Sequence, residues 1–328
     1  GNIAISQLNP GTLLPAVGVE LPKPASSNVL KSLTGGFDLA GTDNSLQLSK
    51  INLKLDDSSL QGEAGISSFK NMASRFALTI DSINLDHYMP APQAAQSKEK
   101  TNTPNTSSEA LLLPVAALRE LNTNGRLRIG KLMASGHQID NFDASVVSAN
   151  GFINLKNLTG NLYGGSLVAT ASIDARSNTP QISFNNRVSN IQASPLLTAL
   201  ADVDYLDGKM NLQVNGTAFG NTLTAIKNTL SGEADFKVTD GILKNTNIEQ
   251  LVCKSIARIR DRQYVVTEQQ PDTHFKEFNG HMNIVKGVMN TDRLLVALNN
   301  MQVTGTGIIN LPQDSLDFGI RAKIMGDL

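Results

Sequence analysis

The chain is dominated by short stretches in which apolar and polar residues alternate. The clearest is 315–324, where Leu316, Phe318 and Ile320 occupy every second position. Because side chains of a β-strand point alternately to the two faces of a sheet, this pattern predicts a strand with one apolar and one polar face. The same alternation recurs along the chain, at residues 76–80, 182–184, 210–214 and 234–238. We therefore expect a mainly β protein.

A few other stretches depart from this alternation. Apolar residues at helical spacing predict short α-helices over 111–121, 194–200, 223–230 and 246–260. Ser194 and Pro195 suit the cap and the first position of the second helix, and Thr246 with Glu249 matches a capping box. Residues 91–109 contain no large apolar side chain. This segment predicts a flexible loop inserted into one continuous sheet that spans residues 1–328.

Composition argues against a nucleic-acid partner and against a membrane-spanning segment. The chain has 28 Lys plus Arg and 29 Asp plus Glu, so it lacks the basic excess typical of nucleic-acid-binding proteins. Charged residues make up only 17% of the chain, and an uncharged polar surface of this kind is common in secreted and periplasmic β proteins. No stretch approaches the roughly 20 apolar residues that cross a membrane, and no signal peptide follows Gly1. We expect a fragment whose targeting segment has been removed.

Candidate chemistry is sparse. The single cysteine, Cys253, excludes an internal disulfide, and its helical context predicts a buried structural thiol. The four histidines show no metal-ligand spacing, and nothing links them to a carboxylate cluster. Residues 125–131 have the spacing of a phosphate-binding loop, but Leu132 stands where a Ser or Thr is required. Asp56-Asp57 is interpreted as a solvated turn. We expect no enzyme, no metal and no cofactor.

Several segments resemble the sequence pattern of the AsmA family. In the C-terminal region 227–328 these are 230–244 (LSGEADFKVTDGILK), 273–280 (THFKEFNG), 290–294 (NTDRL) and 303–307 (VTGTG). Earlier in the chain, 55–62 (LDDSSLQG) and 83–88 (INLDHY) are similar to the family as well. Together they cover most of the chain in family order.

The resemblance implies an envelope protein of a Gram-negative bacterium. Members of the family are anchored in the inner membrane by an N-terminal helix, extend into the periplasm and are implicated in lipid supply to the outer membrane. They are similar to bridge-like lipid-transfer proteins, in which an elongated, curved antiparallel sheet forms an open groove lined by apolar side chains. The resemblance therefore implies phospholipid as a partner, a membrane anchor absent from this chain, further envelope proteins as partners and no catalytic residues.

Alternation and resemblance together predict which side chains line such a groove. The candidates are Leu53, Leu55, Phe76, Leu78, Ile80, Phe184, Leu212, Val214, Phe236, Val238, Ile284, Leu316, Phe318 and Ile320. Two other functions stay open at this point. An envelope scaffold with a closed β-sandwich or solenoid core would bury the same residues without lipid. A polysaccharide-binding domain would need exposed aromatic platforms, and the chain has no Trp and only 4 Tyr.

Overall fold

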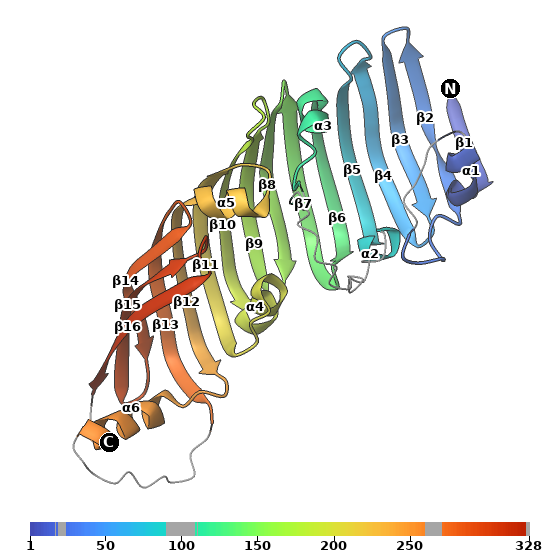
Figure 1. Cartoon of the computed structure of the whole chain (residues 1–328). Coiled ribbons are helices and arrows are strands. Elements are labelled where there is room, and N and C mark those ends of the chain that lie inside the picture. Colours follow the sequence, from blue (N-terminus) through green and yellow to red (C-terminus); the bar gives the residue numbers. More distant parts are fainter. Residues whose placement is uncertain (17, 19–23, 90–108, 110, 260–270, 326–328) are drawn as a thin grey trace, which may run out of the picture. The chain divides into compact units, whose positions relative to one another are not determined.

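The structure, a computed structural model, describes residues 1–16, 18, 24–89, 109, 111–259 and 271–325. Within these residues, sixteen β-strands form one sheet whose strand order is the order of the chain, from β1 to β16 (Figure 1). The first and last strands do not pair with each other, so the sheet is not closed into a barrel. The expectation of a mainly β protein with one sheet and a few short helices is confirmed.

The strands are seven to fourteen residues long. The first eight are β1 (Asn2–Leu8), β2 (Leu33–Thr42), β3 (Ser45–Leu55), β4 (Ser58–Ser68), β5 (Ala73–Asn84), β6 (Thr123–Ala134), β7 (His137–Ala149) and β8 (Phe152–Leu162). The others are β9 (Gly165–Asp174), β10 (Gln181–Gln192), β11 (Leu206–Phe219), β12 (Ser231–Leu243), β13 (Thr273–Val285), β14 (Val288–Ala297), β15 (Met301–Asn310) and β16 (Ser315–Ile324).

Six short helices interrupt the strands of the described chain. They are α1 (Pro10–Ala16), α2 (Leu85–Tyr88), α3 (Val115–Glu120), α4 (Ala193–Ala201), α5 (Leu223–Thr229) and α6 (Ile248–Ile259). The last four fall within or close to the four predicted stretches. The first two were not predicted: α2 has only four residues, about one helical turn, and α1 contains Pro10 and Pro15, which are unusual in a helix.

The predicted helix starts were wrong in detail. α4 begins at Ala193, so Ser194 lies inside its first turn rather than at its cap. α6 begins two residues after Thr246, and the amide of Gln250 donates a hydrogen bond to Asn247 Oδ1 (2.7 Å). The side chain of Asn247 therefore caps this helix, because Asn satisfies a free helix amide as well as Thr does. Cys253 on the same helix is half-buried rather than buried.

Among the neighbouring strands from β1 to β8 and from β10 to β16, one pair departs from the antiparallel pattern. β5 and β6 pair in parallel, with Phe76 opposite Gly125 and Ile80 opposite Ile129. Parallel neighbours need a long crossover connection, whereas antiparallel neighbours need only a short turn. The crossover here contains α2, α3 and the predicted loop 91–109. That loop lies almost entirely outside the described residues.

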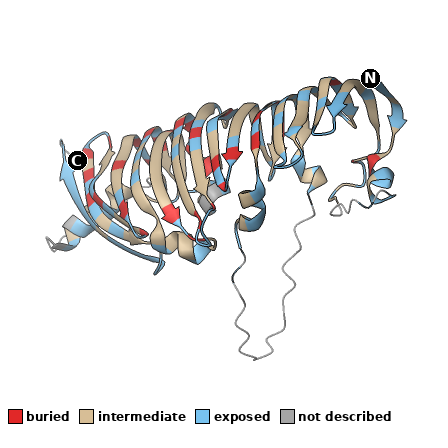
Figure 2. Ribbon diagram, turned by 90° about the horizontal axis from the view of Figure 1, so that it is seen from above, coloured by how far each residue is buried: buried red, intermediate tan, exposed pale blue. Residues whose placement is uncertain are grey.

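The chain divides into two compact units, whose border passes through β9. The first unit comprises residues 1–162 and 170–180, and the second comprises residues 163–169 and 181–328. Each unit buries apolar side chains on one face of its strands, such as Ile51 and Ile129 in the first unit and Ile191 and Val238 in the second. Figure 2 shows buried residues as short segments along individual strands.

Helices supply part of the burial in the second unit. α4 packs on β10 and β11, and α5 packs on β11. Ala193 and Leu196 of α4 are buried in this contact. Because all described strands belong to one sheet, no second sheet of described residues covers the apolar side chains of either unit.

Candidate functional site

Strand register places the predicted apolar residues of the second unit on a single face. Directly opposed residues of neighbouring strands point to the same side of a sheet. One row of such partners runs across seven strands: Val188, Leu212, Phe236, Gly280, Leu294, Gly305 and Ile320. A second row runs through Phe184, Gly216, Gly232, Ile284, Met289, Ile309 and Leu316. These rows contain no charged residue.

The remaining candidates of this unit belong to the same face. Val238 lies opposite Met210 and Phe278, and Val214 lies opposite Ala234. Phe318 lies opposite Gly307. We call this side of the strands the apolar face of the second unit. Partners such as Val188, Met210 and Phe278 were missing from the prediction, although their own strands alternate and the same signal could have found them.

The first unit has an apolar face built in the same way. Its main row consists of Gly35, Leu53, Leu60, Ile80, Ile129 and Phe142. Leu78 lies opposite Gly62 and Leu127, and Phe76 lies opposite Ala64 and Gly125. Leu55 lies opposite Leu33. All five predicted residues of this unit therefore share one side of their strands.

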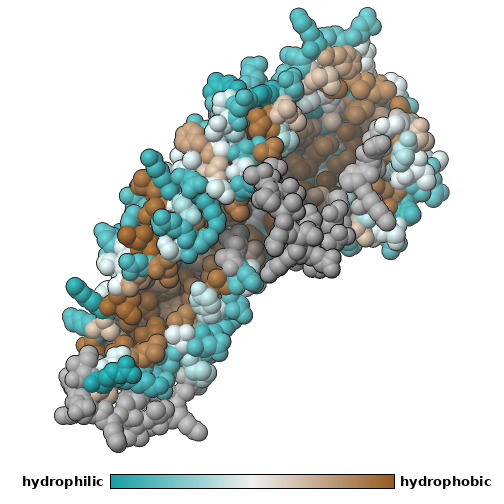
Figure 3. Space-filling model, viewed as in Figure 1, coloured by the Kyte–Doolittle hydropathy of each residue, from teal (hydrophilic) through white to brown (hydrophobic). Residues whose placement is uncertain are grey.

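The apolar face of the second unit is covered on its inner strands and exposed on its last strand. Val238 and Ile284 are 0% and 3% exposed, whereas Leu316 and Ile320 on β16 are 70% and 72% exposed. An edge strand has a neighbour on one side only, so its side chains lack half of their lateral contacts. The strand with the clearest sequence pattern is thus the least covered. Figure 3 shows hydrophobic side chains gathered in recessed surfaces, one over β2–β5 and another over the strands of the second unit.

The opposite side of the strands, which we call the polar face, is occupied by paired polar groups. Lys237 Nζ lies 2.6 Å from Glu277 Oε2, and Arg187 donates a hydrogen bond to Gln213 (2.9 Å). His281 Nδ1 lies 2.8 Å from Asp235 Oδ1, a single carboxylate on the neighbouring strand. A hollow of about 570 Å³ is lined by Arg187, Gln213, Asp235, Lys237 and His281 of this group, together with residues of the apolar row such as Leu212 and Phe236. Among the described residues no group of His, Cys, Asp and Glu could hold a metal ion.

One carboxylate organises the strand ends of the first unit. Asp56 sits in the turn between β3 and β4 with φ 51° and accepts hydrogen bonds from the amides of Leu30, Lys31 and Ser32 (2.7, 2.9 and 3.0 Å). The Tyr88 hydroxyl of α2 donates another at 3.2 Å. Burial acts to raise the pKa of Asp56, but these four bonds together hold it below the ordinary value of 3.8. Asp56 is therefore a structural anchor rather than the solvated turn residue expected from the sequence.

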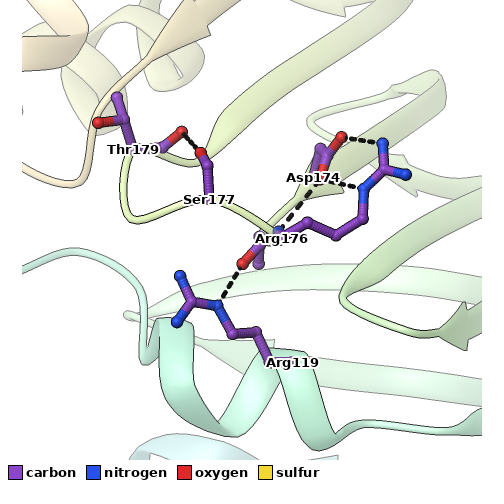
Figure 4. A network of polar contacts seen from close by, with 6 residues as sticks. Arg119, Asp174, Arg176, Ser177 and Thr179 are labelled. Carbon is purple, nitrogen blue, oxygen red and sulfur yellow. Dashed lines mark hydrogen bonds and ion pairs between the residues drawn. The ribbon is translucent and has the colours of Figure 1, made fainter.

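A second polar network fixes α3 within the same unit (Figure 4). Arg119 Nε donates to the carbonyl of Ala175 (2.7 Å). Its terminal nitrogen donates to Asn178 Oδ1 (2.8 Å). Ala175 is fully buried. Beside it, hydrogen bonds from Arg176 lower the pKa of Asp174 to about 2. The network joins a helix to the segment after β9, and no group in it is placed as a nucleophile beside a base.

Each unit thus has one apolar face, and in the second unit the opposite face carries paired polar groups. A sequence model of the AsmA family matches residues 8–294, which is more than half of the chain. The chain belongs to the AsmA family. Protein AsmA of Escherichia coli (strain K12) is 22% identical to this AsmA-family chain over 328 residues, covering 94% of the chain and 51% of that protein. The chain thus spans about half the length of this curated relative.

No solved structure matches this AsmA-family chain. In the part of the chain that the structure describes, no helix is both long and apolar enough to cross a membrane.

Proposed function

We propose that this chain binds phospholipid through its apolar faces and carries it across the periplasm toward the outer membrane, in support of outer-membrane assembly. Membership of the AsmA family supports a role in the envelope. The observation that carries the lipid part is the uncharged row of the second unit, from Val188 to Ile320, which no second sheet of described residues covers. In this proposal the full-length protein is anchored in the inner membrane, and the chain acts without catalysis.

The free energy of burying apolar surface favours acyl chains as the groups that cover the apolar faces. Large exposed apolar patches are rare on soluble monomers, because each costs free energy in water. Burial of one methylene gains about 0.8 kcal/mol, so an acyl chain of about fifteen gains on the order of 10 kcal/mol. A phospholipid would place its tails on the apolar face and keep its head group in solvent. Weak discrimination between head groups follows from this arrangement.

The alternative of a closed β-sandwich scaffold has less support. A sandwich buries its apolar residues between two sheets. All strands of the described residues belong to one sheet, and Ile320 is 72% exposed. A scaffold role would therefore need a protein partner rather than an internal layer to cover the same residues.

The test is the lipid content of the purified chain. We expect phospholipid to co-purify with the wild-type chain and to be detected by mass spectrometry after extraction with organic solvent. Leu212→Asp places a charge on the apolar face and is expected to lose most of this lipid, since a buried unpaired carboxylate is strongly disfavoured. Gln213→Asp places the same charge on the polar face of the same strand and is expected to retain it. A wild-type chain that is reproducibly free of lipid contradicts the proposal.

A further inference from the structure

Five phenylalanines on the apolar faces lie directly opposite a glycine of the neighbouring strand. The pairs are Phe76 with Gly125, Phe184 with Gly216, Phe236 with Gly280, Phe275 with Gly241, and Phe318 with Gly307. The ring of Phe275 lies 6.1 Å from that of Phe278, centroid to centroid, which places it on the apolar face of the second unit. Glycine makes up only 26 of the 328 residues, yet five of the 11 phenylalanines have a glycine as a direct cross-strand partner. Glycine weakens a strand and often marks a place where another group approaches the backbone closely. The pairs therefore call for a common explanation.

Backbone conformation does not explain these glycines. Gly62 and Gly232 have φ of +136° and +158°, where other residues are strained. None of the five paired glycines has such a φ. At Gly280, an added Cβ would lie 2.7 Å from Cε1 of Phe236 and 2.9 Å from a methyl carbon of Leu294. At Gly125, it would overlap three ring atoms of Phe76. In these two pairs, side chains rather than backbone atoms exclude the Cβ.

These contacts define how the rings lie. A Cβ stands one bond length from its Cα, so ring atoms at that position lie almost on the backbone of the neighbouring strand. Phe76 and Phe236 are therefore laid down over the sheet instead of standing up from it. Phe278 packs edge-on against the Phe236 ring, with centroids 4.9 Å apart and planes at 81°, which supports the lowered position. Aromatic rings that cover strand glycines in this way also stabilise a sheet.

We propose that the phenylalanine–glycine pairs set the clearance above the apolar faces, that is, the space left free for a ligand. Because each ring lies over a glycine instead of projecting from the sheet, acyl chains can lie across a flat apolar surface. This inference rests on the proposed lipid function and deepens it. A standing phenyl ring would interrupt the row from Val188 to Ile320, whereas a ring lowered over Gly280 leaves the row continuous. A flat apolar surface without side pockets accepts acyl chains of different lengths and degrees of unsaturation. Phe76 over Gly125 has the same role in the first unit.

The test uses one variant that displaces the Phe236 ring from the sheet and a second variant that also removes the ring. Gly280→Val fills the space under Phe236 and is expected to lift the ring into the path of the lipid. The double variant Phe236→Ala with Gly280→Val removes the obstruction and is expected to restore binding. Gly319→Val is the matched control: Gly319 lies on the polar side of β16, and its added Cβ would meet nothing closer than 3.9 Å. Gly280→Ala is a milder second variant, and circular dichroism verifies folding.

The measurement is binding of a fluorescent-tailed phosphatidylethanolamine, supplied in vesicles of phosphatidylethanolamine and phosphatidylglycerol, to the purified chain. For Gly280→Val we expect affinity roughly tenfold lower, the loss that follows when about two methylenes leave contact. A folded Gly280→Val or Gly280→Ala chain with wild-type affinity overturns the clearance proposal, as does a folded double variant that stays impaired. A wild-type chain that binds no lipid instead overturns the proposed function itself.

Discussion

Asp56 shows how one residue can hold several segments of this fold. Its carboxylate receives amides from residues 30–32 and the hydroxyl of Tyr88, so it joins the segment before β2, the β3–β4 turn and α2. The sequence indicates a turn at Asp56-Asp57, because Asp favours turns and tolerates positive φ. It does not reveal the partners, since the bonded amides lie 24 to 26 residues away. The anchoring role is thus visible only in the structure.

Asp56 makes stability dependent on pH. Its pKa is lower in the folded chain than the ordinary 3.8, so the unfolded chain binds more protons in the window just below that value. Its contribution is complete above pH ~4 and is lost as pH falls through the lowered pKa. We expect Asp56→Ala to cost about 2–3 kcal/mol at pH 7, the value of hydrogen bonds to a charged group.

Chemical denaturation of both chains between pH 7 and pH 3 checks this expectation. The difference between wild type and Asp56→Ala is predicted to shrink toward pH 3, while Asp57→Ala, an exposed neighbour, stays close to wild type. A difference that is constant with pH would show that the carboxylate charge has no part in the anchor.

At the scale of elements, strands were predictable and helix boundaries were less so. Alternation identifies a strand such as β16 because every second residue reports the same face. Helices of six or seven residues carry few such signals: α3 spans Val115–Glu120, although the apolar spacing predicts 111–121. Leu111 is 73% exposed, and Pro114 disfavours helical backbone at Leu113, the residue before it. The parallel pairing of β5 with β6 also escapes periodicity, since alternation is the same in both pairings.

Substitution of Arg119 tests which contacts hold the short helix α3 in place. Arg119→Ala removes the donor to the carbonyl of fully buried Ala175 and leaves that carbonyl unpaired, at a cost of about 1–3 kcal/mol. We expect faster amide hydrogen exchange over residues 115–120 and 175–180. Arg176→Ala serves as the control, because its ion pair with Asp174 is on the surface and is screened by solvent. Equal exchange in wild type and Arg119→Ala would mean that the helix is held by other contacts.

At the scale of the whole molecule, the chain is one sheet in which the fourteen candidate residues share a face within each unit. Alternation predicts this common side of the strands, since a period of two leaves each strand only one choice of face, whereas the role of these residues in lining a lipid groove stays a prediction. The phenylalanine–glycine pairing was not predictable, because cross-strand partners depend on register and on bulges, such as the register shift between Asp207 and Lys209. Alternation predicts an apolar face but does not identify the molecule that covers it. Phospholipid is inferred from membership of the AsmA family and from the free energy gained when acyl chains are buried.

The most direct measurement places a photocrosslinking residue at neighbouring positions on opposite faces, in cells. The pairs, apolar position first, are Phe76 with Ala77, Phe236 with Lys237, and Phe318 with Asp317. After irradiation, phospholipid attached to the chain is identified by mass spectrometry. The account predicts capture at the first position of each pair and none at the second. Equal capture at both positions, or no capture at any of the three apolar positions, would contradict it.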